Sequence, residues 1–143
     1  MMFRKRAYSL LDVSTGLSPR QKQKHPEAQM QRLFVKRWRL DPRTKDLPAC
    51  AVPNGGKRGA REASLMKAEG VDRGVPDWML YEPSKDGQFV GLAIEFKAPT
   101  GGRISADQTR WHEALRGRRW RVEVMTNEGA AWQLIVEHLG LER

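Results

Sequence analysis

The sequence predicts an α/β domain in which α-helices flank a central mixed β-sheet. Two observations lead to this fold class. Segments whose apolar residues recur at helical spacing alternate along the chain with short apolar runs of strand length. The chain has 143 residues, the size of one ordinary domain with a single core. A sheet with helices packed on its faces combines such elements in one domain.

The first predicted element is a helix over residues 26–40. Pro26 suits the first helical position, where a backbone N–H is not needed. Glu27 and Gln31 lie one turn apart and extend the buried stripe of this helix toward its N-terminal end. Four apolar residues at helical spacing are expected to form that stripe: Met30, Leu33, Phe34 and Trp38.

Three shorter elements are expected next. An apolar piece within residues 48–59 is ended by the turn signal Asn54-Gly55-Gly56. Residues 60–70 are predicted to be helical, with Gly70 as the C-terminal cap. Residues 75–83 contain a strand of about five residues bounded by prolines. The side chains of the second helix that are expected to face the core are Ala63, Met66 and Ala68.

The run over residues 89–97 is the clearest strand of the sequence. A hairpin turn around Asp86-Gly87 is expected to fold it back beside the preceding strand. Because side chains alternate along a strand, the run has two distinct faces. Its apolar face consists of Leu92, Ile94 and Phe96, and its other face consists of Ala93, Glu95 and Lys97.

The C-terminal part is predicted to form a helix, a strand and a helix, over residues 105–116, 121–126 and 128–140. Ser105 and Gln108 have the spacing of a capping box, and Gly140 is expected to end the last helix. Two residues continue the buried face of the first of these helices: Trp111 and Leu115. The tryptophans expected in the core are Trp38, Trp111 and Trp132, and Trp78 is expected to pack beneath the functional site.

The positive charge is concentrated in the first third of the chain. The formal net charge is +9, and residues 1–45 hold 12 Lys and Arg against 3 Asp and Glu. Residues 1–24 show no sustained period and are predicted to form a basic, flexible arm, followed by one folded domain over residues 25–143. A basic segment on a near-neutral body suits a nucleic-acid partner, since each neutralised phosphate releases counterions. The alternative is that this charge serves solubility alone.

Composition excludes several classes of protein. Hydrophobic residues make up 39% of the chain, too many for disorder along its whole length. The single cysteine, Cys50, allows no intramolecular disulfide and favours a reducing compartment. No apolar run approaches the ~20 residues of a membrane span, and the N-terminus lacks a signal-peptide pattern. The sequence therefore predicts a cytoplasmic protein without membrane contact.

Three charged residues suggest a site for chemistry. Glu95 and Lys97 share one strand face about 7 Å apart, an arrangement that needs a polar partner if it is buried. Asp77 lies at the start of the strand within residues 75–83, which is expected to pair with the strand that carries Glu95 and Lys97. Two carboxylates on adjacent strand ends can hold a hard divalent cation such as Mg²⁺. A lysine beside them can orient or help deprotonate a water and stabilise charge that develops on phosphate. The alternative is a structural ion pair.

The residues around this site resemble a known family. Pro76-Asp77 followed by Glu95-Phe96-Lys97 resembles the signature of the PD-(D/E)XK nuclease superfamily. Four flanking motifs are similar to its VRR-NUC group, the virus-type replication-repair nucleases of phages and bacteria: PNGG at 53–56, GVPDWML at 74–80, GLAIEFKAPTGGRIS at 91–105 and Q..WHEAL at 108–115. The resemblance covers about residues 26–127 and implies a restriction-endonuclease-like core.

The resemblance also implies a function and a set of site residues. It implies Mg²⁺- or Mn²⁺-dependent cleavage of DNA, with Asp77, Glu95 and the backbone carbonyl of Phe96 as metal ligands and Lys97 as the catalytic lysine. Glu27 matches an early acidic residue of the family and Gln108 a later glutamine. Stand-alone members resemble Holliday-junction resolvases that act as homodimers, since two symmetric cuts need two sites. The residues expected to contact DNA are Asn54, Lys57, Arg58 and Arg103.

Several alternatives remain open at this point. Glu27 also suits a first helical turn through the helix dipole, and the capping box alone explains Gln108. The substrate could be a flap or linear DNA, or RNA, whose helix differs in groove shape and carries a 2′-hydroxyl. The same fold could also serve as a DNA-binding module without catalysis. The connection over residues 116–120, RGRRW, could contact DNA or be a solvated loop.

Overall fold

The computed structural model describes residues 25–53 and 58–142. In that part of the chain, helices and strands follow one another in the predicted order. The elements are α1 (Pro26–Leu40), β1 (Ala49–Ala51), α2 (Ala60–Ala68), β2 (Trp78–Leu80), β3 (Gly91–Phe96), α3 (Ala106–Arg116), β4 (Trp120–Met125) and α4 (Glu128–Leu139). The expected arm over residues 1–24 lies outside the described residues.

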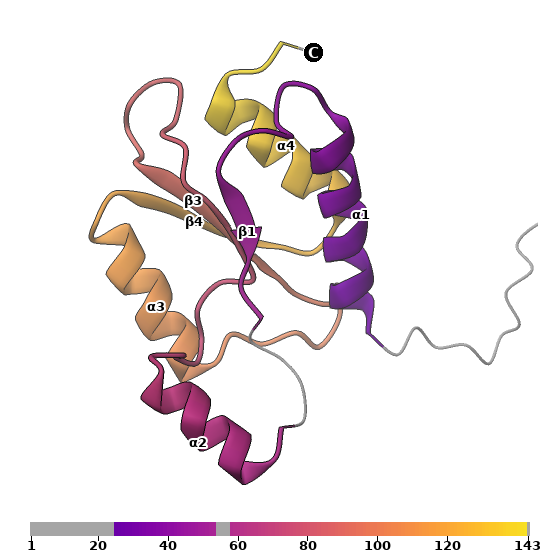
Figure 1. The fold of residues 1–143 in the computed structure, drawn as a ribbon. Helices are drawn as coiled ribbons and strands as arrows, with labels where there is room; N and C mark the ends of the chain where they lie inside the picture. The colour runs from indigo at the N-terminus through magenta and orange to yellow at the C-terminus, as the bar shows by residue number, and fades with distance from the viewer. Residues whose placement is uncertain (1–24, 54–57, 143) are drawn as a thin grey trace, which may run out of the picture.

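The four strands form one mixed sheet in the order β1-β2-β3-β4. β1 pairs with β2 and β2 with β3 in antiparallel fashion, whereas β3 and β4 are parallel. α1 and α4 cover one face of this sheet and α3 covers the other (Figure 1). The predicted α/β fold class is thus confirmed, and the arrangement is consistent with a restriction-endonuclease-like core.

Most of the core lies between the sheet and α1 with α4. The apolar face of β3 packs there, and the Phe34 ring meets Trp78 edge-on at 5.0 Å and Phe96 at 5.6 Å between ring centroids. Trp38 contacts Trp78 from the next turn of α1, at 4.8 Å. Trp78 is therefore buried, as predicted. A smaller apolar cluster beneath α3 contains Met79, Ala93, Leu115 and Val122.

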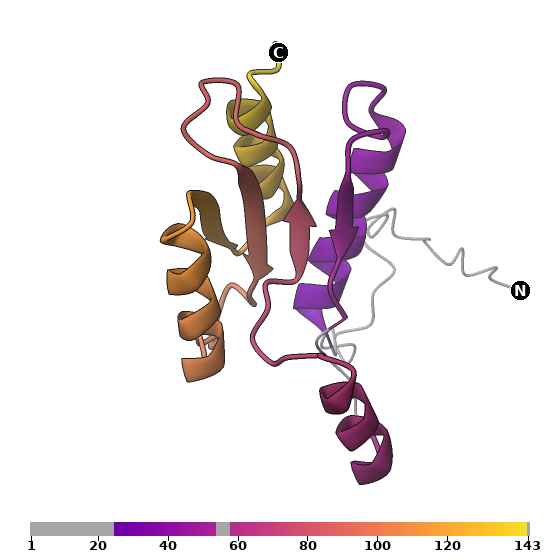
Figure 2. The same cartoon turned by 60° about the vertical axis from the view of Figure 1, so that its left-hand side comes forward.

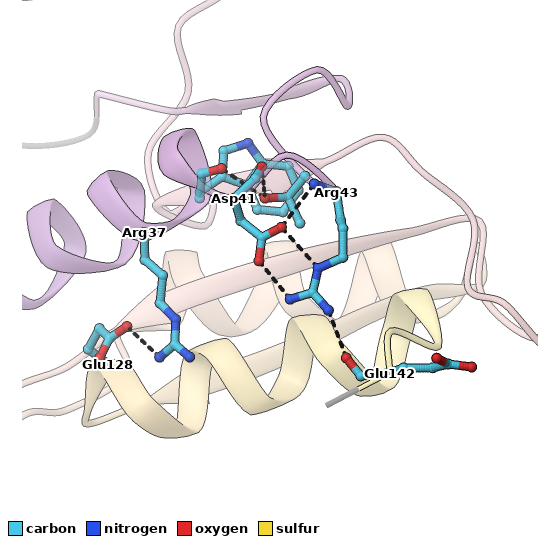
Figure 3. Close-up of polar contacts among 7 residues, drawn as sticks. Arg37, Asp41, Arg43, Glu128 and Glu142 are labelled. Atoms are coloured by element: carbon cyan, nitrogen blue, oxygen red, sulfur yellow. Dashed lines mark hydrogen bonds and ion pairs between the residues drawn. The ribbon is translucent and has the colours of Figure 1, made fainter.

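Charged contacts hold the C-terminal half of α1 against α4. Arg37 Nη1 lies 3.4 Å from Glu128 Oε1 in the first turn of α4. Arg43 binds the Asp41 carboxylate with two side-chain nitrogens and donates to the backbone oxygen of Glu142 at 2.7 Å (Figure 3). These contacts link α1 and the loop after it to α4 and the residues that follow α4, and the other end of α1 reaches the candidate site.

Two predictions of burial are wrong, and a third is confirmed only in part. α2 has no buried residue, because it extends away from the sheet, as Figure 2 shows, and only Met66 of its expected inner face is half-buried. Leu33 is 53% exposed, because it lies about 100° around α1 from Phe34. Trp111 packs against the smaller core cluster as expected but is only half-buried, and its indole N–H donates to Asp72 at 3.2 Å.

β2 and β3 are both shorter than predicted, and β3 covers Gly91–Phe96 where residues 89–97 were expected. β2 has three residues in place of about five, and ten residues separate Leu80 from Gly91 around the expected turn. The turn itself is present, since Gly87 adopts a left-handed φ of 73° and Asp86 accepts a hydrogen bond from Ser84. None of the helices in the described part of the chain is long and apolar enough to cross a membrane.

Candidate active site

The sheet brings Asp77 and Glu95 together. Trp78 of β2 pairs with Ile94 of β3 in antiparallel register, so the next residues outward, Asp77 and Glu95, lie opposite one another. The backbone N–H of Phe96 donates to Asp77 Oδ2 at 2.8 Å. The two carboxylates therefore stand on adjacent strand ends, where β2 begins and β3 finishes.

Glu95 is the most buried member of the site, with 2% of its surface exposed. Its Oε1 lies 3.3 Å from Lys97 Nζ and also accepts from Gln108 Nε2. Its Oε2 is buried and has no hydrogen-bond partner among the residues that the structure describes. Burial, and then the charge of Asp77, raise the pKa of Glu95 from 4.5 to about 7, although Lys97 opposes this shift.

Asp77 is held in a similar environment. Burial raises the pKa of its carboxyl group, and the N–H of Phe96 and the charge of Lys97 act in the opposite direction. Glu27 is a further cause of the increase. Three carboxyl groups therefore meet at this end of the sheet, and Lys97 is the cation beside them.

Lys97 is the first residue beyond β3 and is fixed by its backbone. Its N–H donates to the carbonyl oxygen of Met125 at 3.0 Å, which continues the β3–β4 pairing by one residue. Its side chain is 14% exposed. A lysine on rigid, extended backbone can direct its ammonium group at a small substrate group beside Glu95 with little loss of conformational entropy.

The N-terminal end of α1 completes one side of the site. Glu27 Oε1 accepts from the backbone N–H of Ala98 at 3.1 Å, directly after Lys97. Gln31 Nε2 donates to the backbone oxygen of Asp77 at 3.4 Å. Glu27 thus lies both in the first helical turn and at the edge of the site, so neither interpretation from the sequence excludes the other.

α3 forms the opposite side of the site. Ser105 and Gln108 make the predicted capping box, and the Gln108 amide also donates to Glu95. Gln108 therefore both caps the start of α3 and contacts the Glu95 carboxylate. The backbone of Asp107 and Gln108 packs closely on Gly74, which precedes Asp77 by three residues. This contact ties the loop before Asp77 to the helix that carries Gln108.

The four residues expected to contact DNA are only partly placed. Asn54 and Lys57 lie outside the described residues, but the N–H of Val52 donates to the backbone oxygen of Asp77 at 2.8 Å, so the chain enters that segment beside the site. Arg58 contacts the sulfur of Met66 in α2 at 3.0 Å. Arg103 is exposed on the loop between β3 and α3.

The basic connection over residues 116–120 lies at the other end of β3. Trp120 pairs with Gly91, the first residue of that strand, whereas Glu95 lies near its last. Arg119 donates to the backbone oxygen of Gly87 at 2.7 Å. This connection does not border the candidate site.

Sequence reasoning gave no role to Gly74 or His112. Gly74 has a φ of +85° that the sequence does not reveal. His112 is 4% exposed, and its Nε2 has no partner among the described residues. Burial, Arg116 and Lys97 lower its pKa. Its spacing of four residues from Gln108 places it on the same face of α3, a signal that could have identified it.

The donor set is compatible with a divalent cation. The unpartnered Oε2 of Glu95 is the hard oxygen ligand that Mg²⁺ and Mn²⁺ prefer, and Asp77 supplies a second one across the strand pair. Among the residues that the structure describes, no group of three or more His, Cys, Asp or Glu could hold an ion. A cation here would therefore depend on Asp77, Glu95 and backbone or water oxygens.

The raised pKa of Glu95 leads to a prediction about stability. In EDTA, Glu95→Gln should stabilise the protein at pH 8 by roughly 1–2 kcal/mol and at pH 4.5 by much less. The folded state keeps a proton on Glu95 up to about pH 7, whereas the unfolded state releases it near 4.5. Wild-type stability therefore falls as the pH rises through this window. Urea denaturation at both pH values measures the difference.

The control for this measurement is Glu113→Gln. Glu113 is an exposed carboxylate on α3, and its replacement should change stability equally at both pH values. A stabilisation by Glu95→Gln that is the same at pH 4.5 and pH 8 would show that folding does not raise the pKa of Glu95.

Comparisons with known proteins give two findings. The VRR-NUC domain model matches residues 20–128. A solved structure described as a VRR_NUC domain protein superposes with a TM-score of 0.68, at 20% sequence identity, over 81% of this chain and 89% of that chain. At this identity the structural likeness supports the fold alone. A comparison with curated proteins finds no match.

Proposed function

Because the chain belongs to the VRR-NUC domain family, a family of nucleases, we propose that it is a divalent-metal-dependent endonuclease that hydrolyses phosphodiester bonds of DNA. One observation carries this proposal. Two carboxylates on adjacent strand ends, Asp77 and Glu95, share a buried site with Lys97, and one oxygen of Glu95 has no partner among the described residues. The proposal places the chain in the PD-(D/E)XK superfamily, as a member of phage or bacterial type.

The proposed chemistry assigns a task to each residue. Asp77, Glu95 and the backbone carbonyl of Phe96 would hold Mg²⁺ or Mn²⁺, which when bound supplies Lewis acidity toward water and phosphate. Lys97 Nζ, 3.3 Å from Glu95, stabilises negative charge that develops on the phosphate oxygens. Gln108 positions the Glu95 carboxylate by donating to it. Glu27 holds the backbone beyond Lys97 in place through the N–H of Ala98.

We propose branched DNA, in particular the four-way junction, as the substrate. The basic first third of the chain supports a polyanionic partner. Resolution of a four-way junction needs two symmetric cuts, which a homodimer supplies with one site in each copy. Asn54, Lys57, Arg58 and Arg103 are proposed DNA contacts, and the cytoplasm of a bacterial or phage-infected cell is the proposed place of action.

The test is a cleavage assay with substrates of different shape. End-labelled four-way junction, flap and linear duplex of one sequence, and a duplex RNA, are incubated with the protein in Mg²⁺, Mn²⁺ or EDTA. Metal-dependent, symmetric nicks confined to the junction support the dimeric resolvase. Equal cutting of flap or linear DNA would contradict the preference for junctions but keep the nuclease. Faster cutting of RNA would contradict DNA as the substrate. Binding without cutting in any metal would leave a DNA-binding module.

A further inference from the structure

α1 carries basic side chains on the side that faces away from the sheet. Its core residues, Met30, Phe34 and Trp38, lie on one stripe. At 3.6 residues per turn, Arg32, Lys36 and Arg39 fall within a narrow sector on the opposite side of the helix. All three are exposed. We call these three residues the α1 basic stripe.

The α1 basic stripe differs from the other arginines of this region. Arg37 and Arg43 are engaged by Glu128, Asp41 and Glu142, as Figure 3 shows. Within residues 25–53 and 58–142, by contrast, the three side chains of the stripe make no hydrogen bond or ion pair. The only acidic residue of α1 is Glu27, which faces the candidate active site. The charged residues on the outer side of the helix are therefore all cationic, and they lie beside the exposed apolar Leu40.

A groove on this surface is lined by Gln31, a residue that contacts the candidate active site. The groove has a volume of about 520 Å³, and its other lining residues are the three cations of the stripe and the apolar Ala28, Val35 and Leu40. Gln31 also donates to the backbone oxygen of Asp77. Gln31 thus contacts the backbone of Asp77 and lines the same groove as the row of cations.

We propose that the α1 basic stripe binds the sugar-phosphate backbone of the nucleic-acid substrate at a distance from the cleaved phosphate. This proposal rests on the proposed function of the site and adds a second surface of the protein that contacts the substrate. The stripe spans about 10 Å along the helix axis at 1.5 Å per residue. Phosphates of one strand follow at about 3.4 Å along a duplex axis, so a stripe of about 10 Å spans about three phosphate-to-phosphate steps.

Charge disfavours the other occupants of this groove. In a two-fold homodimer with α1 at its centre, the stripe of one copy would face the same cations of the other. The N-terminal segment that precedes α1 is itself basic, with 6 Lys and Arg against 1 Asp over residues 1–24. Neither occupant neutralises the stripe, whereas a polyanion does.

The experiment compares two variants with the same change in charge. In R32Q/K36Q/R39Q the stripe is neutral. In the control K45Q/K67Q/K85Q, three other exposed basic residues are replaced that lie outside α1 and outside the candidate site. Binding of labelled four-way junction and of linear duplex is measured by fluorescence anisotropy in EDTA, at five salt concentrations. Co-sedimentation with vesicles rich in phosphatidylserine is measured in parallel.

For the stripe variant, the slope of log affinity against log salt should become shallower by about 2–3, and affinity near 0.1 M salt should fall at least tenfold. The control should differ from wild type by less than about 1 in slope. At saturating protein, the single-turnover cleavage rate of the stripe variant should equal that of wild type, since the stripe does not touch the reacting phosphate.

Two outcomes overturn the proposal, and a third separates it from the proposed function. Equal slopes for the stripe variant and the control would show that α1 does not contact the phosphates, even if the wild type cleaves DNA. A loss of vesicle binding with unchanged nucleic-acid binding would assign the stripe to a membrane surface. If the wild type binds the DNA with the expected slope but cleaves nothing, the proposed function fails while the stripe still stands.

Discussion

Lys97→Ala is expected to lower the rate of DNA cleavage by about 10³-fold or more and to leave DNA binding unchanged. Lys97 Nζ lies 3.3 Å from Glu95 in a site where burial weakens solvent screening. A cation aimed at developing phosphate charge in such a site contributes mainly to the transition state, so its loss lowers the rate of the chemical step. Single-turnover cleavage with saturating protein measures that step.

The control for this prediction is Lys45→Ala. Lys45 is an exposed lysine in the loop after α1, and its side chain makes no hydrogen bond or ion pair among the described residues, so its removal should not change the rate. Circular dichroism and DNA-binding measurements identify any loss of folding in Lys97→Ala. Cleavage by a folded Lys97→Ala variant at more than a tenth of the wild-type rate would exclude Lys97 from catalysis.

The second large effect is expected from Gly74→Ala. A Cβ at Gly74 would lie 2.3 Å from the backbone carbon of Asp107 and 2.6 Å from the N atom of Gln108. These are backbone atoms of α3, so the clash can be relieved only by moving the helix or the loop that leads to Asp77. We expect a loss of roughly 2–4 kcal/mol, or about 8–15 °C in Tm. Thermal unfolding measures it.

Gly70→Ala separates the clash from backbone strain. Gly70 has a similar positive φ, 95°, but a Cβ there would meet nothing within 4 Å. Its replacement should cost only the strain of a left-handed alanine, about 1 kcal/mol. The Gly74 variant should also lose cleavage at temperatures where it is still folded, because Gln108 moves relative to Glu95. Equal Tm values for the two variants would contradict the close packing of Gly74 on α3.

Side chains with a clear period allowed much of the fold to be predicted from the sequence. The alternation of Leu92, Ile94 and Phe96 with Ala93 and Glu95 identified β3 and both of its faces, and the structure confirms the two apolar clusters on either side. The turn at Asp86-Gly87 indicated that β2 returns beside β3, which brings Asp77 opposite Glu95. Local sequence patterns thus sufficed to predict single elements and the pairing of elements that are close in the sequence.

Other features depend on contacts that no local pattern encodes. The α2 sequence has apolar residues at helical spacing, but no described element packs over them, so its expected inner face is exposed. Gly74 is required by the approach of α3, 33 residues later in the chain. The capping box correctly predicted the start of α3, but only the three-dimensional structure reveals that Gln108 also reaches Glu95. The cationic row on α1 became recognisable as a surface only once the partners of Arg37 and Arg43 were known.

The most direct test of the site is metal-dependent cleavage by wild type and Asp77→Asn under identical conditions. End-labelled DNA is incubated with saturating protein in Mg²⁺, in Mn²⁺ and in EDTA, and the products are resolved at single-nucleotide length. We expect cutting by the wild type in both metals, none in EDTA, and a loss of at least about 10²-fold in Asp77→Asn, which removes one carboxylate ligand but keeps its size. Cleavage in EDTA, or an Asp77→Asn variant as active as wild type in Mg²⁺, would contradict a metal-dependent nuclease site at Asp77, Glu95 and Lys97.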